Sequence, residues 1–155
     1  MTRFELIQII SGTFGSFGFS ILFNIRGRRL PFAVLGGFLS WCVYVLFDNL
    51  GIGEVLNYFL VAILVSAYAE IMARRLKSPT TTFIMPSLIP LIPGASLYYT
   101  MRYAFEGLSD AFATKAIYTL ELASALALGI IIASAVSKAV FGLRAKYQKK
   151  KSGNA

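Results

Sequence analysis

Apolar residues occur in long runs along this chain, separated by short polar or charged segments. A helix needs about 20 predominantly apolar residues to cross the hydrocarbon core of a bilayer. Five runs approach or reach this length, and we expect each to form one transmembrane helix. They cover residues 6–23, 30–47, 55–73, 83–100 and 114–136.

The pattern therefore predicts an all-α integral membrane protein with five transmembrane helices. No low-complexity linker or second soluble region separates the runs, so residues 1–155 are expected to form a single membrane domain. The first run is expected to be retained as a helix. It is too long for the apolar part of a signal peptide, and it ends in Phe23-Asn24 rather than in small residues.

Basic residues predict the orientation of these helices, because Lys and Arg are retained on the cytoplasmic side of a membrane. Nearly all of the 15 Lys and Arg residues follow the first, third or fifth run. The exceptions are Arg3, Arg102 and Lys115. We predict an N-terminus outside and a cytoplasmic C-terminus, with residues 138–155 as a basic tail that contacts anionic lipid of the bilayer.

Composition narrows the possible functions. The chain is 57% hydrophobic and 14% charged, with a mean hydropathy of +0.69, which is too apolar for a soluble domain of this size. Cys42 is the single cysteine and there is no histidine, so we expect no metal and no other cofactor. The net charge of +8 lies in clusters beside apolar runs, so nucleic acid is not an expected partner. No spacing of nucleophile and base suggests an enzyme.

Three prolines and a glycine interrupt the fourth run. An interior proline lacks an N–H and clashes with the carbonyl four residues earlier, so we expect the helix to break near the middle of the bilayer. Transporters use the N-termini of such half-helices to bind anionic substrate groups, and we expect the second half to begin near residue 93. A kink that serves packing alone is the alternative. The candidate substrate-binding residues are Pro86, Pro90, Pro93, Gly94, Ala95 and Ser96.

Two acidic residues lie inside predicted spans, where a carboxylate is costly and is a functional candidate by default. Glu70 precedes Arg74 by one helical turn, and an i,i+4 ion pair at the cytoplasmic interface is the interpretation that we favour. Glu121 lies roughly two turns into the fifth span from the outer side, near Tyr118 and Ser124 in helical spacing. It is a candidate proton-coupling group or, equally, a residue that hydrogen-bonds between helices.

Small residues at helical spacing predict packing faces, because they let helix backbones approach each other. One face, in the first run, contains Ser11 and Gly15, or Gly12 and Ser16, and another contains Gly129, Ala133 and Ser137. Either face is expected to contact another helix of this chain or of a partner.

Aromatic clusters lie mostly near the predicted span ends. We interpret them as belt residues at the headgroup level of the membrane. They are Trp41-Tyr44, Tyr58-Phe59 and Tyr98-Tyr99.

A series of short motifs extends over nearly the whole chain. It comprises Phe23-Asn24, Leu35-Gly36-Gly37, Ala69-Glu70, Arg74-Arg75-Leu76-Lys77-Ser78-Pro79, Phe83, and then Pro86, Pro90, Pro93 and Gly94. In this order it resembles the threonine/serine exporter (ThrE) family, specifically its short, separately encoded membrane subunit. The part from Arg74 to Gly94 is the most specific. The sequence departs from the family at Arg26, where members often carry a proline, and this concerns the shape of the first cytoplasmic loop.

The resemblance implies a multi-pass exporter of small amino acids or related organic acids in a bacterial inner membrane. It also implies a partner, a longer subunit with a soluble region and membrane helices of its own. Independently, two five-helix units in tandem would have opposite orientations, as in many secondary transporters. Two alternatives remain open: a homo-oligomeric channel or proton-coupled exporter, and a scaffold subunit that transports nothing.

Overall fold

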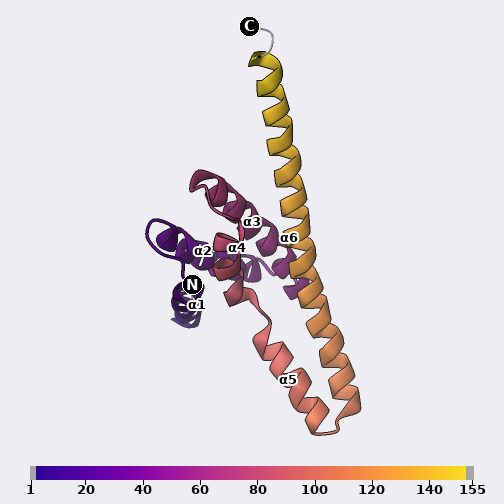
Figure 1. Ribbon diagram of the computed structural model, residues 1–155. Coiled ribbons are helices and arrows are strands. Elements are labelled where there is room, and N and C mark those ends of the chain that lie inside the picture. Colours follow the sequence, from indigo (N-terminus) through magenta and orange to yellow (C-terminus); the bar gives the residue numbers. More distant parts are fainter. Residues whose placement is uncertain (1–2, 153–155) are drawn as a thin grey trace.

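The computed structural model describes residues 3–152, with side chains described from Arg3 to Phe141. The described residues are all-helical, as predicted, with no strand among them. Figure 1 shows the helices, with α5 and the first half of α6 forming a hairpin that points away from α1–α4. The elements are α1 Arg3–Leu22, α2 Arg29–Asn49, α3 Glu54–Arg75, α4 Thr81–Leu88, a 3₁₀ turn η1 Ile89–Leu91, α5 Gly94–Phe105 and α6 Ser109–Ser152.

In the part of the chain that the structure describes, four continuous helices are long and apolar enough to cross a membrane, namely α1, α2, α3 and the part of α6 over Ser109–Phe141. A fifth crossing is formed if the bent pair Thr81–Leu91 and Gly94–Phe105 counts as one span, with an angle of 57° between its two parts. Four of the five predicted spans thus correspond to single helices, and the fourth corresponds to the bent pair. The last helix is much longer than expected, because it continues beyond residue 136 to Ser152.

Close approaches between helices organise the bundle, and two of them use the predicted small residues. A Cβ atom built on Gly37 of α2 would overlap Ser16 of α1. On the opposite side, a Cβ on Gly129 of α6 would lie 2.7 Å from the Ala62 Cβ and from the Phe59 carbonyl oxygen of α3. Gly12, Ser16 and Gly129 therefore serve contacts within this chain.

α4 lies at the centre of the bundle and packs against α1, α2 and α3. Phe83 is fully buried in a cluster with Ala33 of α2 and Ala69 of α3. Leu91 of η1 continues this core, packed against Val61 and other residues of α3. α5 leaves the bundle at this point and packs along α6.

α3 and α6 run parallel over most of the length of α3. Tyr118 meets Glu54 at one end of the pair, and Ser137 donates a hydrogen bond of 3.3 Å to Glu70 near the other. The hairpin of α5 and α6 therefore extends beyond the end of α3 at which Glu54 lies (Figure 1). The basic loops after α1 and α3 converge at the opposite end.

Candidate functional site

The break between α4 and α5 follows from the spacing of its prolines. Pro90 has no N–H, so the carbonyl of Pro86 loses its helical donor. That carbonyl accepts a hydrogen bond of 2.9 Å from Ser16 Oγ instead. After η1, Ile92 is extended with a ψ of 125°, and Pro93 follows with φ −74° and ψ 58° as the residue that caps α5. The backbone therefore turns between the two helices without a continuous ladder.

α5 begins at Gly94, as the sequence predicts. Its first intrahelical bond runs from the Leu97 N–H to the Pro93 carbonyl, with a length of 3.0 Å. No side chain caps the helix, and the N–H groups of Ala95 and Ser96 have no partner among the described residues. These free donors and the positive end of the helix dipole make this turn suitable for an anion.

This turn forms part of the wall of a cavity of about 600 Å³. Four helices and the broken segment contribute to it. The lining residues are Trp41 of α2, Glu54 and Tyr58 of α3, Pro90, Ile92, Pro93, Gly94, Ala95, Ser96 and Tyr99 of η1, the link and α5, and Thr114, Lys115, Tyr118 and Leu122 of α6.

The cavity contains one acid and one base. Glu54 accepts a hydrogen bond from the hydroxyl of Tyr118. The ammonium of Lys115 lies 4.7 Å from the centroid of the Tyr118 ring, a cation–π contact. Within the described part of the chain, Glu54 and Lys115 form no ion pair with each other. A solute that carries a positive and a negative charge can therefore interact with Glu54 and with Lys115 separately.

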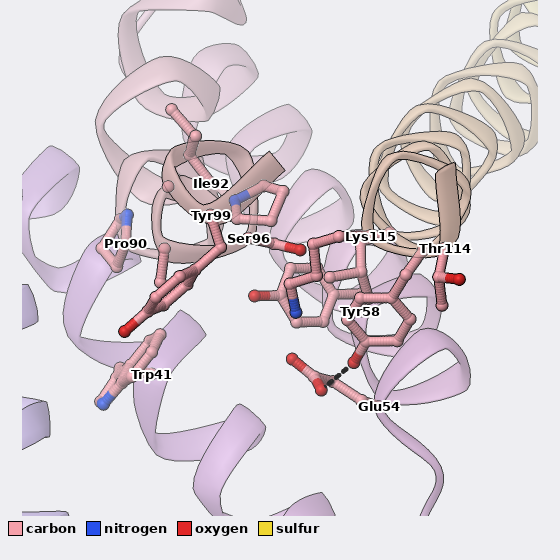
Figure 2. A pocket seen from close by; sticks show the side chains of 14 residues that line it. Trp41, Glu54, Tyr58, Pro90, Ile92, Ser96, Tyr99, Thr114 and Lys115 are labelled. Atoms are coloured by element: carbon pink, nitrogen blue, oxygen red, sulfur yellow. Dashed lines mark hydrogen bonds between the residues drawn. The ribbon is translucent and has the colours of Figure 1, made fainter. Parts of the chain in front are cut away.

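Aromatic side chains shape the cavity opposite and beside these charges. Figure 2 shows Trp41 and Tyr99 on one side, with Glu54, Lys115 and Tyr58 extending toward the same space from the other. The rings of Trp41 and Tyr44 stack at 4.9 Å, and Tyr44 meets Tyr58 edge to face at 5.5 Å. These contacts pack Trp41, Tyr44 and Tyr58 against one another beside the cavity.

Hydroxyl groups connect α5 to α6 beside the cavity. Ser96 Oγ and Thr119 Oγ1 lie 2.8 Å apart, and Thr100 Oγ1 lies 3.1 Å from Thr119 Oγ1. Thr119 also donates to the carbonyl of Lys115, at 2.8 Å. The start of α5 and the face of α6 that carries Lys115 are thus held together.

The structure brings together most of the predicted binding residues. Pro90, Pro93, Gly94, Ala95 and Ser96 all line the cavity. The exception is Pro86, which does not line the cavity, although its carbonyl is the one that Pro90 leaves without a helical donor. It is buried inside α4, where its own missing N–H leaves the helix intact.

The two predicted intramembrane acids lie outside the cavity. Glu70 is near the basic end of the bundle, where its carboxylate pairs with Arg74 at 3.5 Å, the expected i,i+4 contact. Glu121 is exposed, in an apolar groove between α3 and α6 that it shares with Ser124 and Phe59. Neither acid contacts the broken segment.

Sequence reasoning missed Glu54, Lys115 and Tyr118, and it assigned Trp41 and Tyr58 to the membrane belt. A signal for them exists in the helical spacing. Glu54 and Tyr58 are four residues apart, and so are Tyr118 and Leu122, so each pair lies on one helix face. What the sequence lacked was the register between α3 and α6.

Comparison with known proteins places this site within a described family. The family model described as "Threonine/Serine exporter, ThrE" matches residues 8–136, which include every residue that lines the cavity. No curated protein and no solved structure matches the sequence.

Proposed function

The chain belongs to the threonine/serine exporter family, and from this premise we propose that it is the short membrane subunit of a two-component secondary exporter. Membership makes it a multi-pass membrane protein with an exporter-type transport role, in a family of transporters rather than enzymes. The proposed substrates are threonine, serine and related small amino or organic acids. The proposed location is the bacterial inner membrane, with the N-terminus outside.

In this proposal the cavity beside the broken span binds the amino acid as a zwitterion. The carboxylate of the solute lies against the free N–H groups of Ala95 and Ser96, where the dipole of α5 favours an anion. The ammonium of Lys115 adds a second positive charge on the same cavity wall. The single observation that carries the proposal is this juxtaposition of a free helix N-terminus with Lys115 and Glu54.

The ammonium group of the solute takes the other half of the cavity. Glu54 supplies the opposite charge, and the faces of Trp41 and Tyr58 supply cation–π contacts. A volume of about 600 Å³ is within the usual range for small-molecule sites. It leaves space for water around a solute as small as threonine.

The incomplete wall of the cavity supports the need for a partner. α5 packs along α6 alone, and most of its side chains are exposed. A second five-span unit of opposite orientation would complete the pathway, which is the arrangement of many secondary transporters. The small face of α1 at Gly15 also has no neighbour within 4 Å, which leaves it free for a partner helix. Any proton-coupling role of Glu121 depends on the partner in the same way, because this residue lies outside the cavity.

The test is export of labelled threonine from cells that express this chain with its longer partner, compared with cells that express the chain alone. We expect export only from the pair. Glu54→Gln and Lys115→Gln should each lower it about tenfold, because each removes a hydrogen bond to a charged group of the solute, which contributes about 1.5–3 kcal/mol. Glu106→Gln and Arg102→Gln are the matched controls, since these residues pair with each other on the exposed end of α5.

Competition by modified solutes shows which charge of threonine interacts with Lys115 and which with Glu54. Threonine methyl ester lacks the carboxylate charge and N-acetylthreonine lacks the ammonium charge, so neither should compete with threonine in the wild type. Lys115→Gln should reduce the preference for threonine over the ester, and Glu54→Gln should reduce the preference over the acetyl compound. Full export by the chain alone would favour a homo-oligomer. Unchanged export in both charge variants would remove the cavity as the binding site.

A further inference from the structure

A second charged feature lies at the opposite end of the bundle from the cavity. The loops after α1 and α3 surround a hollow of about 360 Å³, which we call the basic hollow. Five of its six lining residues are cations. They are Arg26, Arg28, Arg29, Arg75 and Lys77, with Leu76 as the sixth.

None of these five side chains has an acidic or hydrogen-bonding partner among the described residues. Arg74, which immediately precedes Arg75, differs from them, because it pairs with Glu70 and stacks on the Phe141 ring at 3.9 Å. All five side chains are exposed, so water and salt screen their mutual repulsion, and a bound phosphate would add charge-assisted hydrogen bonds to them. The basic hollow therefore has the charge pattern of an anion site.

The C-terminal ends of α1 and α3 have the same backbone conformation, which holds the two loops in place. Asn24 and Lys77 both take the left-handed conformation, with φ of 56° and 47°. In each case the next residue closes the turn, through bonds of 2.9 Å from Ile25 N–H to the Ser20 carbonyl and from Ser78 N–H to the Ala73 carbonyl. Ile25 is buried against the bundle core, so the first loop is anchored rather than free.

An apolar groove adjoins the basic hollow. It lies between α1 and α2, has a volume of about 440 Å³ and begins at Leu30, the residue after Arg29. Thr13 is its only polar lining residue. From Pro31 to Phe38 the groove follows α2 for roughly 10 Å along the helix axis. The lining residues are Thr13, Phe17, Leu30, Pro31, Val34, Leu35 and Phe38.

We propose that the basic hollow and this groove form one binding site for an anionic phospholipid. The phosphate diester occupies the hollow between Arg28 and Arg75, and an acyl chain lies in the groove along Leu35. Arginine is well suited to the first task, since its planar fork binds phosphate oxygens in pairs. Basic pockets between membrane helices are known to select anionic headgroups.

The groove distinguishes a lipid from a free phosphate compound. A soluble anion would fill the basic hollow and leave the apolar groove uncovered. A lipid would fill both, with its headgroup in the basic hollow and an acyl chain in the groove. The occupant must therefore carry negative charge and a hydrocarbon chain together. The site is far from the cavity, so the inference does not depend on the transported solute.

The test uses the purified chain in a neutral detergent and counts the lipids that it retains by native mass spectrometry. Dioleoyl phosphatidylglycerol should be retained about tenfold more strongly than dioleoyl phosphatidylcholine. Arg28→Gln with Arg75→Gln should abolish this preference, because each basic residue near an anionic lipid surface contributes about a factor of five or more in affinity. Arg3→Gln with Lys138→Gln removes the same charge elsewhere and should leave the preference unchanged.

Two further arms examine the groove and the competing occupants. Leu35→Gln should lower retention of phosphatidylglycerol, while Leu64→Gln, an exposed leucine of α3 outside the groove, should not. Equal loss in both pairs of charge variants would overturn the proposal in favour of a general charge effect. Complete displacement of the lipid by glycerol 3-phosphate would overturn it in favour of a soluble anion. Poly-glutamate binding that requires Arg28 and Arg75, without lipid selectivity, would overturn it in favour of an acidic protein partner.

Discussion

The two halves of the broken span, α4 and α5, are held in different ways. α4 is enclosed by three other helices, and Phe83 and Ser87 in it are fully buried. α5 packs along α6 alone, and Ser96 is its only buried residue. The comparison shows that a helix can be broken in a membrane protein when one half is anchored in the core and the other borders a cavity. It predicts that substitutions in α4 affect stability, whereas substitutions at the start of α5 affect transport.

The largest effect expected from this comparison concerns the side of the membrane on which each end of the α4–α5 segment lies. If α4 and α5 are one broken span, Lys77 and Glu106 lie on opposite sides; a re-entrant loop would place them on the same side. In a Cys42→Ser background, an impermeant maleimide added outside should label Glu106→Cys and Asp48→Cys, and should not label Lys77→Cys or Arg28→Cys. Labelling of both Lys77→Cys and Glu106→Cys from outside would exclude a crossing.

The next effect concerns the break itself. Pro93→Ala with Gly94→Ala should extend helical hydrogen bonding across the link and narrow the cavity, so that threonine export falls about tenfold or more. Folding should be unaffected, because both residues lie at the start of a helix rather than in a tightly packed interior. The matched change is Pro86→Ala within α4, which lies outside the cavity; it should lower thermal stability and leave export per molecule in the membrane within about twofold. Wild-type export by the double variant would make the break a packing feature only.

A third comparison uses two glycines. A Cβ on Gly37 would overlap Ser16 and would lie 3.4 Å from the Pro86 carbonyl oxygen, so Gly37→Ala should destabilise the packing around α4 by about 1–3 kcal/mol. A Cβ on Gly94 meets nothing within 4 Å, and Gly94→Ala should be neutral or stabilising by up to about 1 kcal/mol. Thermal unfolding in detergent, followed by circular dichroism, measures both. Similar midpoints for the two variants would contradict the division between anchored and free halves.

The smallest effect is the coupling of α5 to α6 through hydroxyl groups. Ser96→Ala and Thr119→Ala, combined in a double-mutant cycle, should give a coupling free energy of roughly 0.6 kcal/mol, the average for hydrogen bonds between membrane helices. Unfolding in mixed micelles provides the measurement. A coupling near zero would mean that α5 is held to α6 by apolar packing alone.

Sequence reasoning was successful where local chemistry decides the outcome. The length of an apolar run determines whether a helix can span a bilayer, and a proline in a helix interior removes one backbone hydrogen bond. The start of α5 at Gly94 follows from these rules. The extension of α6 beyond Val136 was missed because the apolar pattern stops there. The strong helix formers Ala, Lys, Arg and Leu carry the helix on.

The errors arose where residues distant in sequence meet. Pro86 does not interrupt α4, and the carbonyl that Pro90 leaves unpaired is satisfied by Ser16, 70 residues earlier. Glu54 and Lys115 resembled ordinary charges at span ends, where such residues are common and carry no specific signal. Their convergence depends on the side-by-side register of α3 and α6. No spacing within one helix encodes that register.

The length of α6 has a mechanical consequence. Its 44 residues extend for roughly 66 Å, about twice the thickness of the hydrocarbon core of a bilayer. If α6 tilts together with α3, to which it is bonded both near Glu54 and near Glu70, a rod of this length transmits displacement as a lever. A tilt of about 5° would move the two ends by roughly 3 Å in opposite directions. Because Lys115 lies near one end and the basic tail forms the other, a force applied to the tail by a partner or by the membrane surface would change the width of the cavity.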